Sequence, residues 1–379
     1  VAARFLQGMG GAMMVPVGRL VILRSIAKAQ LVRALSWLTV PALLGPMMGP
    51  PLGGLITTYG NWRYIFLINI PMGLLGIFLA WRHIPLLLSE PKPLDVRGFL
   101  LSAIGLALTM FGFASLGRHL VSTELAAGCL LAGIAGLALY VLHARRHPHP
   151  LIDLGLLQVP TFSVGVIGGS LFRIGVGATP FLLPLMLQLS FGLDPLQSGL
   201  ITFASAAGAM FMKTLAARIL RRFGFRPVLV ANALAASLLL CGFGLFRADT
   251  PYPLLIGVLL ASGCFRSLQF TSLNAITYAD IEPERMGQAS SLAGMAQQVA
   301  LAIGVTIGGY ALTVASLASG LPMDAAINFT FAFLTVGLVS ASSAWMMLRL
   351  APDAGAEMSG KARPGEEVAE PKPLQRPGT

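Results

Sequence analysis

Three arginines lie inside long apolar stretches of the sequence, where a permanent positive charge is rare. Arg4, Arg173 and Arg266 each lie well inside a stretch long enough to cross a membrane. A charged side chain at that depth costs several kcal/mol unless it faces water or a partner. A guanidinium can hold a carboxylate through two parallel hydrogen bonds. The three side chains are therefore candidates for substrate binding or for interaction with a proton site.

Each arginine has two interpretations. Arg4 either faces a cavity and modulates a nearby proton site, or caps backbone carbonyls at a helix break; Gln7, one turn away, could hold it in place. Arg173 and Arg266 find no acid within the body of any apolar stretch, because all 15 acidic residues fall in connections, at helix ends or in the tail. They would therefore pair with an acid in helices that precede Val1, or with an anionic substrate.

A histidine-rich connection offers a second set of candidate ligands. His143, His147 and His149 lie close together in the sequence, near two arginines and Asp153. Imidazoles and a carboxylate could bind a metal, and a solvated basic loop is the alternative, so we assign no metal and no cofactor. The sequence contains no glycine-rich phosphate-binding loop and no nucleophile–base arrangement, which argues against an ATP-driven pump and an enzyme.

The elements that position these residues must be membrane helices. Hydrophobic residues make up 55% of the 379 positions, charged residues only 11%, and the mean hydropathy is +0.78. A soluble domain carries about 25% charged residues. The net charge of +11 could suggest nucleic acid, but the basic residues form short clusters between apolar runs. That pattern is typical of a cytoplasmic membrane face, so we expect a lipid bilayer and no nucleic acid as partner.

Eleven stretches are apolar enough to cross a bilayer core, which takes about 20 residues as a helix. They are apolar on all sides and lack the alternation of membrane barrel strands, so we predict helices. The stretches lie near 1–23, 35–56, 64–81, 99–116, 125–142, 163–190, 199–217, 228–246, 254–278, 288–315 and 328–349.

The distribution of arginine and lysine predicts the orientation. Most of them fall in one set of alternate connections, whereas the opposite set holds only Arg63, Arg118 and Arg247. The basic set should be cytoplasmic, and so should the C-terminus. The first helix would then run inward, and the chain begins with Val1 rather than Met. We therefore expect further residues before Val1.

Two matches suggest that the chain contains a repeat. Arg-Phe-Leu-Gln at 4–7 matches Arg-Ser-Leu-Gln at 266–269, and Gly45, Gly49 and Gly53 are echoed by Gly304 and Gly308. The offsets are nearly equal, which is typical of parallel halves in transporters; chance spacing of small residues is the alternative. If the halves match, three helices precede Val1 and a hairpin separates two bundles of six.

Three consecutive motifs carry a resemblance to a known family. Arg-Phe-Leu-Gln-Gly-Met-Gly-Gly-Ala at 4–12, followed by Pro16, resembles the fourth-helix motif of major facilitator drug:proton antiporters. Gly-Pro-Met-Met-Gly-Pro-Pro-Leu-Gly-Gly at 45–54 resembles their fifth-helix antiporter motif. Asn-Trp-Arg-Tyr-Ile-Phe-Leu-Ile-Asn-Ile-Pro-Met-Gly at 61–73 is similar to the sixth-helix signature of the fourteen-helix, EmrB/QacA-like branch. The resemblance covers residues 1–350.

Within that branch, the segments 172–175, 212–213 and 222–226, together with Pro184, look most similar to the MdtD-like exporters. The chain departs from the family in two ways. The family's first three helices, with their cytoplasmic gate motif and an acidic residue used in proton coupling, are absent. In the second copy of the gate motif, Arg221 stands where the family's first copy has an acid, which puts symmetric gating in doubt.

The resemblance implies an all-α polytopic membrane protein with the major facilitator fold, with 11 membrane helices here and 14 in an N-terminally complete protein. The expected domains are 1–81, the remainder of an N-terminal bundle; 82–98, a cytoplasmic linker; 99–142, an inserted hairpin; 143–162, a second linker; 163–350, a six-helix bundle; and 351–379, a disordered cytoplasmic tail. The expected transport-motif and cavity residues are Arg4, Gln7, Gly8, Gly45, Pro46, Gly49, Gly53, Asn69, Arg173, Arg266 and Gln269.

Two of these motifs have an expected physical role in the helices that carry them. The glycines at 45, 49 and 53 recur every four residues and form a groove into which another helix can pack closely; the resemblance implies that this helix seals the cavity against the second half. The alternative is plain packing. Asn69-Ile70-Pro71 should break its helix, because proline removes a backbone donor.

The predicted function is secondary active efflux of drugs or other small molecules from the bacterial inner membrane by alternating access. The resemblance alone implies coupling to protons, and a periplasmic adaptor is a further candidate partner. The lack of acids within the apolar stretches that hold Arg173 and Arg266 motivates an alternative, export of small organic anions such as carboxylates. A membrane sensor or partner subunit that does not transport is the third hypothesis, although the 29-residue tail is too short to form a signalling domain.

Overall fold

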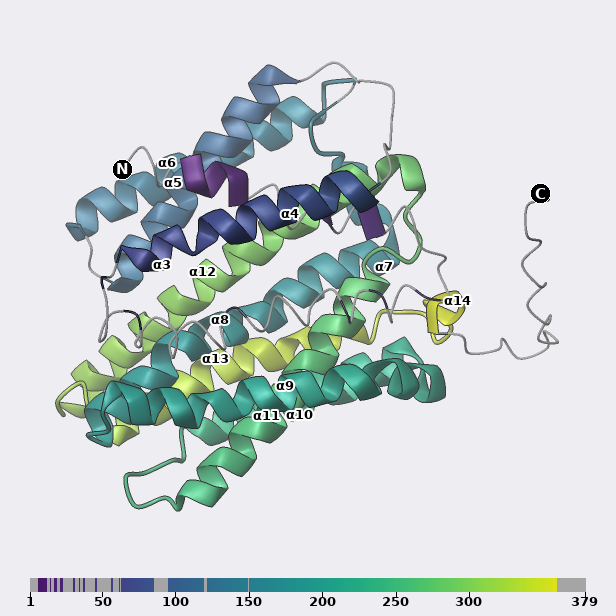
Figure 1. Cartoon of the computed structure of the whole chain (residues 1–379). Coiled ribbons are helices and arrows are strands. Elements are labelled where there is room, and N and C mark those ends of the chain that lie inside the picture. The colour runs from purple at the N-terminus through teal and green to yellow at the C-terminus, as the bar shows by residue number, and fades with distance from the viewer. Residues whose placement is uncertain are drawn as a thin grey trace.

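The protein is built from long helices joined by short connections. The computed structural model describes residues 63–84, 95–118, 121–148 and 150–359, with residue 61 and scattered positions between residues 6 and 56. This described part contains helices and no strand (Figure 1). Nine of its helices are long and apolar enough to cross a membrane. They match the last nine predicted stretches, whereas 1–23 and 35–56 lie largely outside the described residues.

The helix bounds follow the predicted stretches closely. The α-helices are α3 (Tyr64–Leu67), α4 (Asn69–His83), α5 (Val96–Arg118), α6 (Thr123–Ala144), α7 (Pro160–Ser163), α8 (Gly169–Leu185), α9 (Pro195–Phe223), α10 (Phe225–Phe243), α11 (Tyr252–Ile276), α12 (Met286–Ser319), α13 (Ala326–Met347) and α14 (Ala356–Ser359). Short 3₁₀ turns lie at Leu154–Gln158 and Pro283–Arg285, and π-helical turns flank α8 at Val164–Gly168 and Met186–Ser190.

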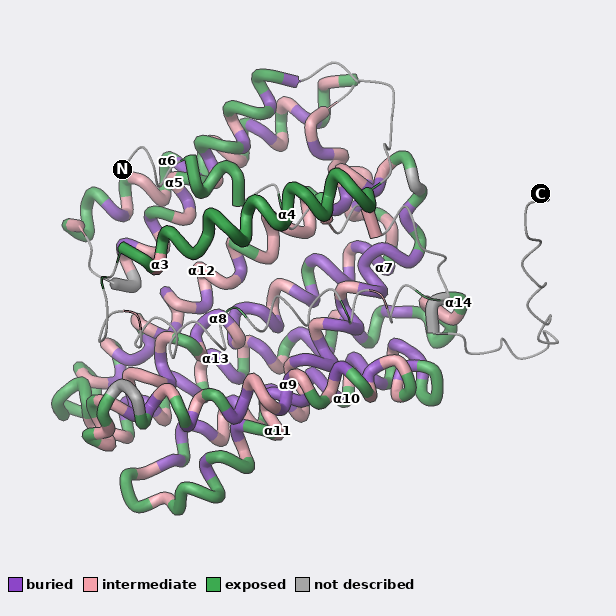
Figure 2. The backbone as a smooth tube through the Cα atoms, in the orientation of Figure 1, coloured by how far each residue is buried: buried purple, intermediate pink, exposed green. Residues whose placement is uncertain are grey.

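Helices α3 and α4 form one apolar element with no buried residue. Figure 2 shows α4 exposed along its length. Within it, the Asn69 side chain donates a hydrogen bond to the Ile65 carbonyl oxygen over 3.3 Å, and α3 passes into α4 through Ile68. Asn69 therefore forms a bond within its own helical element, next to the interruption at Ile68, and Pro71 is itself part of α4.

Helices α5 and α6 pack against each other as a hairpin, and small residues set their separation. A Cβ atom added to Gly112 would lie 2.8 Å from the Cα atom of Leu130, and one added to Gly105 would lie 2.9 Å from the Leu137 nitrogen. Helix α5 also packs on α12, where the Thr306 hydroxyl donates to the Phe113 carbonyl oxygen over 2.8 Å. The hairpin therefore packs against the helical bundle that follows it in the chain.

The segment from α7 to α13 forms a bundle in which α8 packs on α12 and α13, α9 on α11, and α10 on α13 (Figure 1). Its core has two clusters, one at each end. One includes Phe162, Phe225 and Ile276, and the other includes Leu182 and Phe333. Buried side chains thus fill both ends of the bundle.

A single glycine joins α9 to α10. Asp194 caps the N-terminus of α9 by accepting a hydrogen bond from the Gln197 amide. At the other end, Gly224 adopts φ = 83°, a conformation that side chains with a Cβ rarely take. The chain therefore reverses sharply, within the basic segment that resembles a gate motif.

The first residues of the predicted tail, 351–359, pack against the bundle. Ala354 packs against the core, and a Cβ atom added to Gly355 would lie 2.8 Å from the rings and methyl groups of Phe225 and Ile276. Residues 356–359 form α14. The prediction of disorder from residue 351 is therefore wrong for 351–359, because these small residues fit against the ends of α10 and α11.

A candidate cationic site between α8, α9 and α11

Helices α9 and α11 approach each other to backbone contact. A Cβ atom added to Gly263 would collide with the Ser205 carbonyl oxygen, and one added to Gly208 would collide with that of Leu260. The Ser267 hydroxyl also donates to the Ala209 carbonyl oxygen over 2.8 Å. Such close approach is typical of small residues at membrane helix interfaces. It brings polar side chains of the two helices within reach of each other.

Two cations bridge this interface. Arg266 on α11 donates from Nη2 to the Ser205 hydroxyl over 3.0 Å. Lys213 on α9 donates from Nζ to the Thr271 hydroxyl over 2.7 Å. Lys213 is buried, with 9% of its surface exposed, and Arg266 is half-buried. Hydroxyl acceptors carry no charge, so these two hydrogen bonds hold the cations in position without neutralising them.

Arg173 adds a third cation from α8. Its side chain is 5% exposed, and its Cζ atom lies 5.4 Å from the centroid of the Phe270 ring on α11. The ring of Phe172 meets Phe270 edge to face at 6.2 Å. A guanidinium over an aromatic face is attracted by the ring quadrupole. Residues 266–271 of α11 therefore contact Arg173 from α8 and Ser205 and Lys213 from α9.

Gln269, in the same segment, is tied into the protein interior. It is fully buried, its Oε1 accepts from Asn232 Nδ2 over 2.8 Å, and its Nε2 donates to the Leu229 carbonyl oxygen over 3.3 Å. Its Nε2 also lies 3.2 Å from the Met347 sulfur on α13. These contacts give Gln269 a structural role: it fixes the segment against α10 and α13.

Replacing Gln269 with leucine is expected to lower the free energy of unfolding by about 1–3 kcal/mol, because the buried amide of Asn232 would lose an acceptor. Thermal unfolding of the purified protein in detergent measures the change. The double variant Gln269→Leu with Asn232→Leu should recover part of the loss, since it removes both polar partners. A single variant as stable as the wild type would contradict this role.

The other predicted site residues lie elsewhere. The structure describes Gln7, Gly8 and Gly45 as exposed helical positions. The expected residues Arg4, Pro46, Gly49 and Gly53 lie outside the described residues. The structure therefore brings together Arg173, Arg266 and Gln269 of the predicted set.

Gly304 and Gly308, the repeat counterparts of the groove glycines, lie on α12. A Cβ atom added to Gly304 would collide with the Ile174 carbonyl oxygen, and one added to Gly308 would lie 3.1 Å from Leu182 Cδ1. Both neighbours belong to α8. In this bundle, therefore, α8 fills the groove on α12.

Sequence reasoning missed several members of the site. Lys213 entered only as part of a resemblance, although a lysine inside an apolar stretch is itself a signal of function. Ser205, Asn232 and Phe270 gave no such signal, because hydroxyl, amide and aromatic side chains are common in membrane helices. Their roles depend on which helix faces α11.

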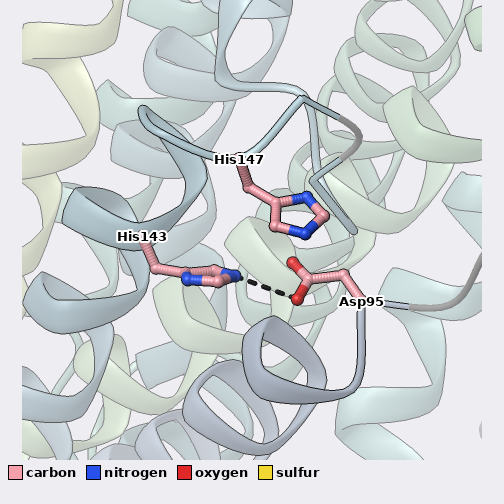
Figure 3. A group of neighbouring side chains, drawn as sticks. All are labelled: Asp95, His143 and His147. Carbon is pink, nitrogen blue, oxygen red and sulfur yellow. Dashed lines mark hydrogen bonds and ion pairs between the residues drawn. The ribbon is translucent and has the colours of Figure 1, made fainter.

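The carboxylate beside the histidine-rich connection comes from a distant part of the sequence. His143 lies beside Asp95, from before α5, rather than beside Asp153, and its Nε2 atom is 2.9 Å from Asp95 Oδ1 (Figure 3). Asp153 pairs instead with Arg285, at 2.6 Å. Asp95 reaches His143 because α5 and α6 pack as a hairpin, which brings the residue before α5 to the end of α6.

The sequence is similar to known proteins over most of its length. The sequence matches the model of the Major Facilitator Superfamily over residues 1–178 and 165–377. It is 40% identical over 315 residues to the proteins named "Putative multidrug resistance protein MdtD" of Salmonella heidelberg (strain SL476) and Salmonella typhimurium (strain LT2). The matches cover 82% of this chain and 66% of each relative, so the chain spans slightly less than two thirds of their length.

Proposed function

Because the chain belongs to the Major Facilitator Superfamily, we propose that it acts in secondary transport and exports small molecules across the membrane that it spans. The matched family consists of transporters, in agreement with the prediction that the chain is not an enzyme. Its nine described apolar helices make it a multi-pass membrane protein. The proposed location is the bacterial inner membrane with a cytoplasmic C-terminus, as the arginine and lysine distribution favours.

The observation that carries the proposal is the cationic site between α8, α9 and α11. Arg173, Lys213 and Arg266 lie on three different helices around one polar segment of α11. Cations within membrane helices are costly and mark substrate or ion pathways. In alternating access, helices of one bundle move against the other around such a site. Drug efflux is the first candidate activity, in line with the relatives' name.

A second candidate is export of small organic anions. Lys213 and Arg266 hydrogen-bond to hydroxyls, and a third cation lies across Phe270. In a low-dielectric site these charges attract a carboxylate and repel a cationic drug. A carboxylate could accept two parallel hydrogen bonds from the Arg266 guanidinium. The site chemistry therefore favours anions.

Transport by inside-out vesicles that contain the full-length protein tests the proposal. We expect accumulation of a test substrate when a proton gradient is imposed, and collapse of accumulation on addition of a protonophore. The panel comprises a cationic dye and a small aromatic carboxylate, with empty vesicles as the control. Transport that survives the protonophore would contradict proton coupling. Absence of any transport across the panel would favour a sensor or partner subunit.

A further inference from the structure

Three potential metal ligands meet at the base of the α5–α6 hairpin, away from the cationic site. Asp95 directly precedes α5, His143 lies in the last turn of α6, and His147 follows that helix. One ligand atom from each residue can be chosen so that all three lie within 4.8 Å of one another. Figure 3 shows both imidazole rings turned toward the carboxylate.

One oxygen of Asp95 has no hydrogen-bond partner among the described residues. The residue is 6% exposed, and its Oδ1 accepts from the Gly98 amide over 2.9 Å and faces His143 Nε2. Its Oδ2 is buried and forms no hydrogen bond within the described structure, although an unsatisfied buried polar atom is costly. In Figure 3 this oxygen points toward the ring of His147. A Cβ atom at Gly98 would collide with Oδ2, so the glycine provides the space that this oxygen occupies.

The Asp95 carboxylate faces the imidazoles of His143 and His147. A carboxylate beside imidazoles is a ligand set that transition metals favour.

We propose that Asp95, His143 and His147 bind one divalent cation of the zinc class. Two imidazole nitrogens and one carboxylate oxygen are suitable zinc ligands, and water can fill the fourth position. Bonds of about 2.0–2.2 Å place tetrahedral ligand atoms about 3.4 Å apart. The ligand atoms lie within 4.8 Å of one another, so binding would require the partly exposed His147 side chain to move closer to the other two. Magnesium and calcium prefer oxygen ligands, so the two imidazoles disfavour them.

The cation would replace a proton. His143 Nε2 and Asp95 Oδ1 are 2.9 Å apart and share a proton as a hydrogen bond. A metal ion requires a lone pair on the nitrogen that it binds. A neutral His143 would therefore carry its proton on Nδ1 and bind the cation through Nε2.

Binding would fasten the hairpin to the loop that leads into the bundle. The loop is already attached on both sides: the Tyr140 hydroxyl accepts from the Ile152 amide over 2.8 Å, and Gln288 donates to the Pro150 carbonyl oxygen over 3.1 Å. The cation would add a link between the start of α5, the end of α6 and this loop. It would thereby stiffen the junction between hairpin and bundle.

Zinc titration of the full-length protein tests the site. The protein carries no polyhistidine tag, is purified in detergent and is stripped with a chelator, and zinc binding is then followed by calorimetry. We expect Asp95→Asn and His147→Gln each to weaken binding at least about tenfold. His83→Gln is the matched control, because His83 is exposed on α4, where its Nδ1 atom lies 3.1 Å from the Leu79 carbonyl oxygen. It should bind zinc as the wild type does.

Two further measurements separate ligand loss from misfolding. Cobalt should give the absorption bands of a tetrahedral site in the wild type and His83→Gln but not in His147→Gln. Zinc should raise the unfolding temperature of the same two proteins, since a ligand of the folded state stabilises it. Equal zinc affinity in the wild type, Asp95→Asn and His147→Gln, or no tetrahedral cobalt spectrum in the wild type, would overturn the proposal.

Discussion

Replacing Gly263 with alanine is expected to destabilise the bundle, because even one methyl group cannot fit between α9 and α11. The added Cβ atom would meet the backbone carbonyl oxygen of Ser205, which cannot move without shifting α9. Overpacking of this kind costs about 1–3 kcal/mol. The unfolding temperature and the monodisperse fraction in size-exclusion chromatography should both fall. Transport should fall as well, since Ser205 holds Arg266.

The matched control for this prediction lies on the same helix. Gly257 is exposed, and a Cβ atom added there would have no neighbour within 4 Å. Gly257→Ala should therefore be neutral or stabilising by up to about 1 kcal/mol, since alanine favours a helix over glycine. The two substitutions are chemically identical and are expected to differ in sign. Equal stability of the two variants would show that α9 and α11 do not approach as closely as described.

Replacing Arg266 with glutamine is expected to reduce export of small carboxylates about 10- to 100-fold. A hydrogen bond to a charged group contributes about 1.5–3 kcal/mol, and each 1.4 kcal/mol corresponds to about tenfold. Glutamine keeps polarity at the site but removes the charge that attracts the anion. Export of a cationic dye should be unchanged or improved. Arg173→Gln should act in the same direction, because Arg173 lies across Phe270. Initial export rates at equal protein levels in vesicles measure both effects.

Two controls separate charge from fold. Arg266→Lys keeps the charge but loses the planar guanidinium, so it should show an intermediate rate. Arg349→Gln removes an exposed arginine that stacks on Trp345 at the end of α13, and it should leave export unchanged. Wild-type carboxylate export in both Arg173→Gln and Arg266→Gln, with normal amounts in the membrane, would count against the anion hypothesis.

Nearness in the sequence does not identify the carboxylate that lies beside His143. His143 and Asp153 are close in the chain, yet the structure pairs Asp153 with Arg285 and places Asp95 beside His143. Asp95 and His143 are 48 residues apart. Only the packing of α5 against α6 decides which carboxylate meets the imidazole.

The same limit applies within the membrane bundle. Arg173, Arg266 and Gln269 could be selected from the sequence, because charged and amide side chains stand out in apolar stretches. The sequence did not separate their roles: Gln269 binds Asn232 and α10, whereas Arg266 binds Ser205 on α9. One turn of helix directs neighbouring side chains to different partners, and the identity of those partners depends on the position of other helices.

Hydropathy and motif order are properties of consecutive residues, so the lipid environment, the positions of the membrane helices and the family could be predicted from the sequence alone. Helix bounds within the described chain follow from the same local signal. The packing of the helices was needed to show that Lys213 reaches Thr271, that α8 fills the groove at Gly304, and that Asp95 lies against His143. These contacts join residues from different helices. They depend on the rotation and separation of whole helices, which the close packing of small residues sets and which no local pattern specifies.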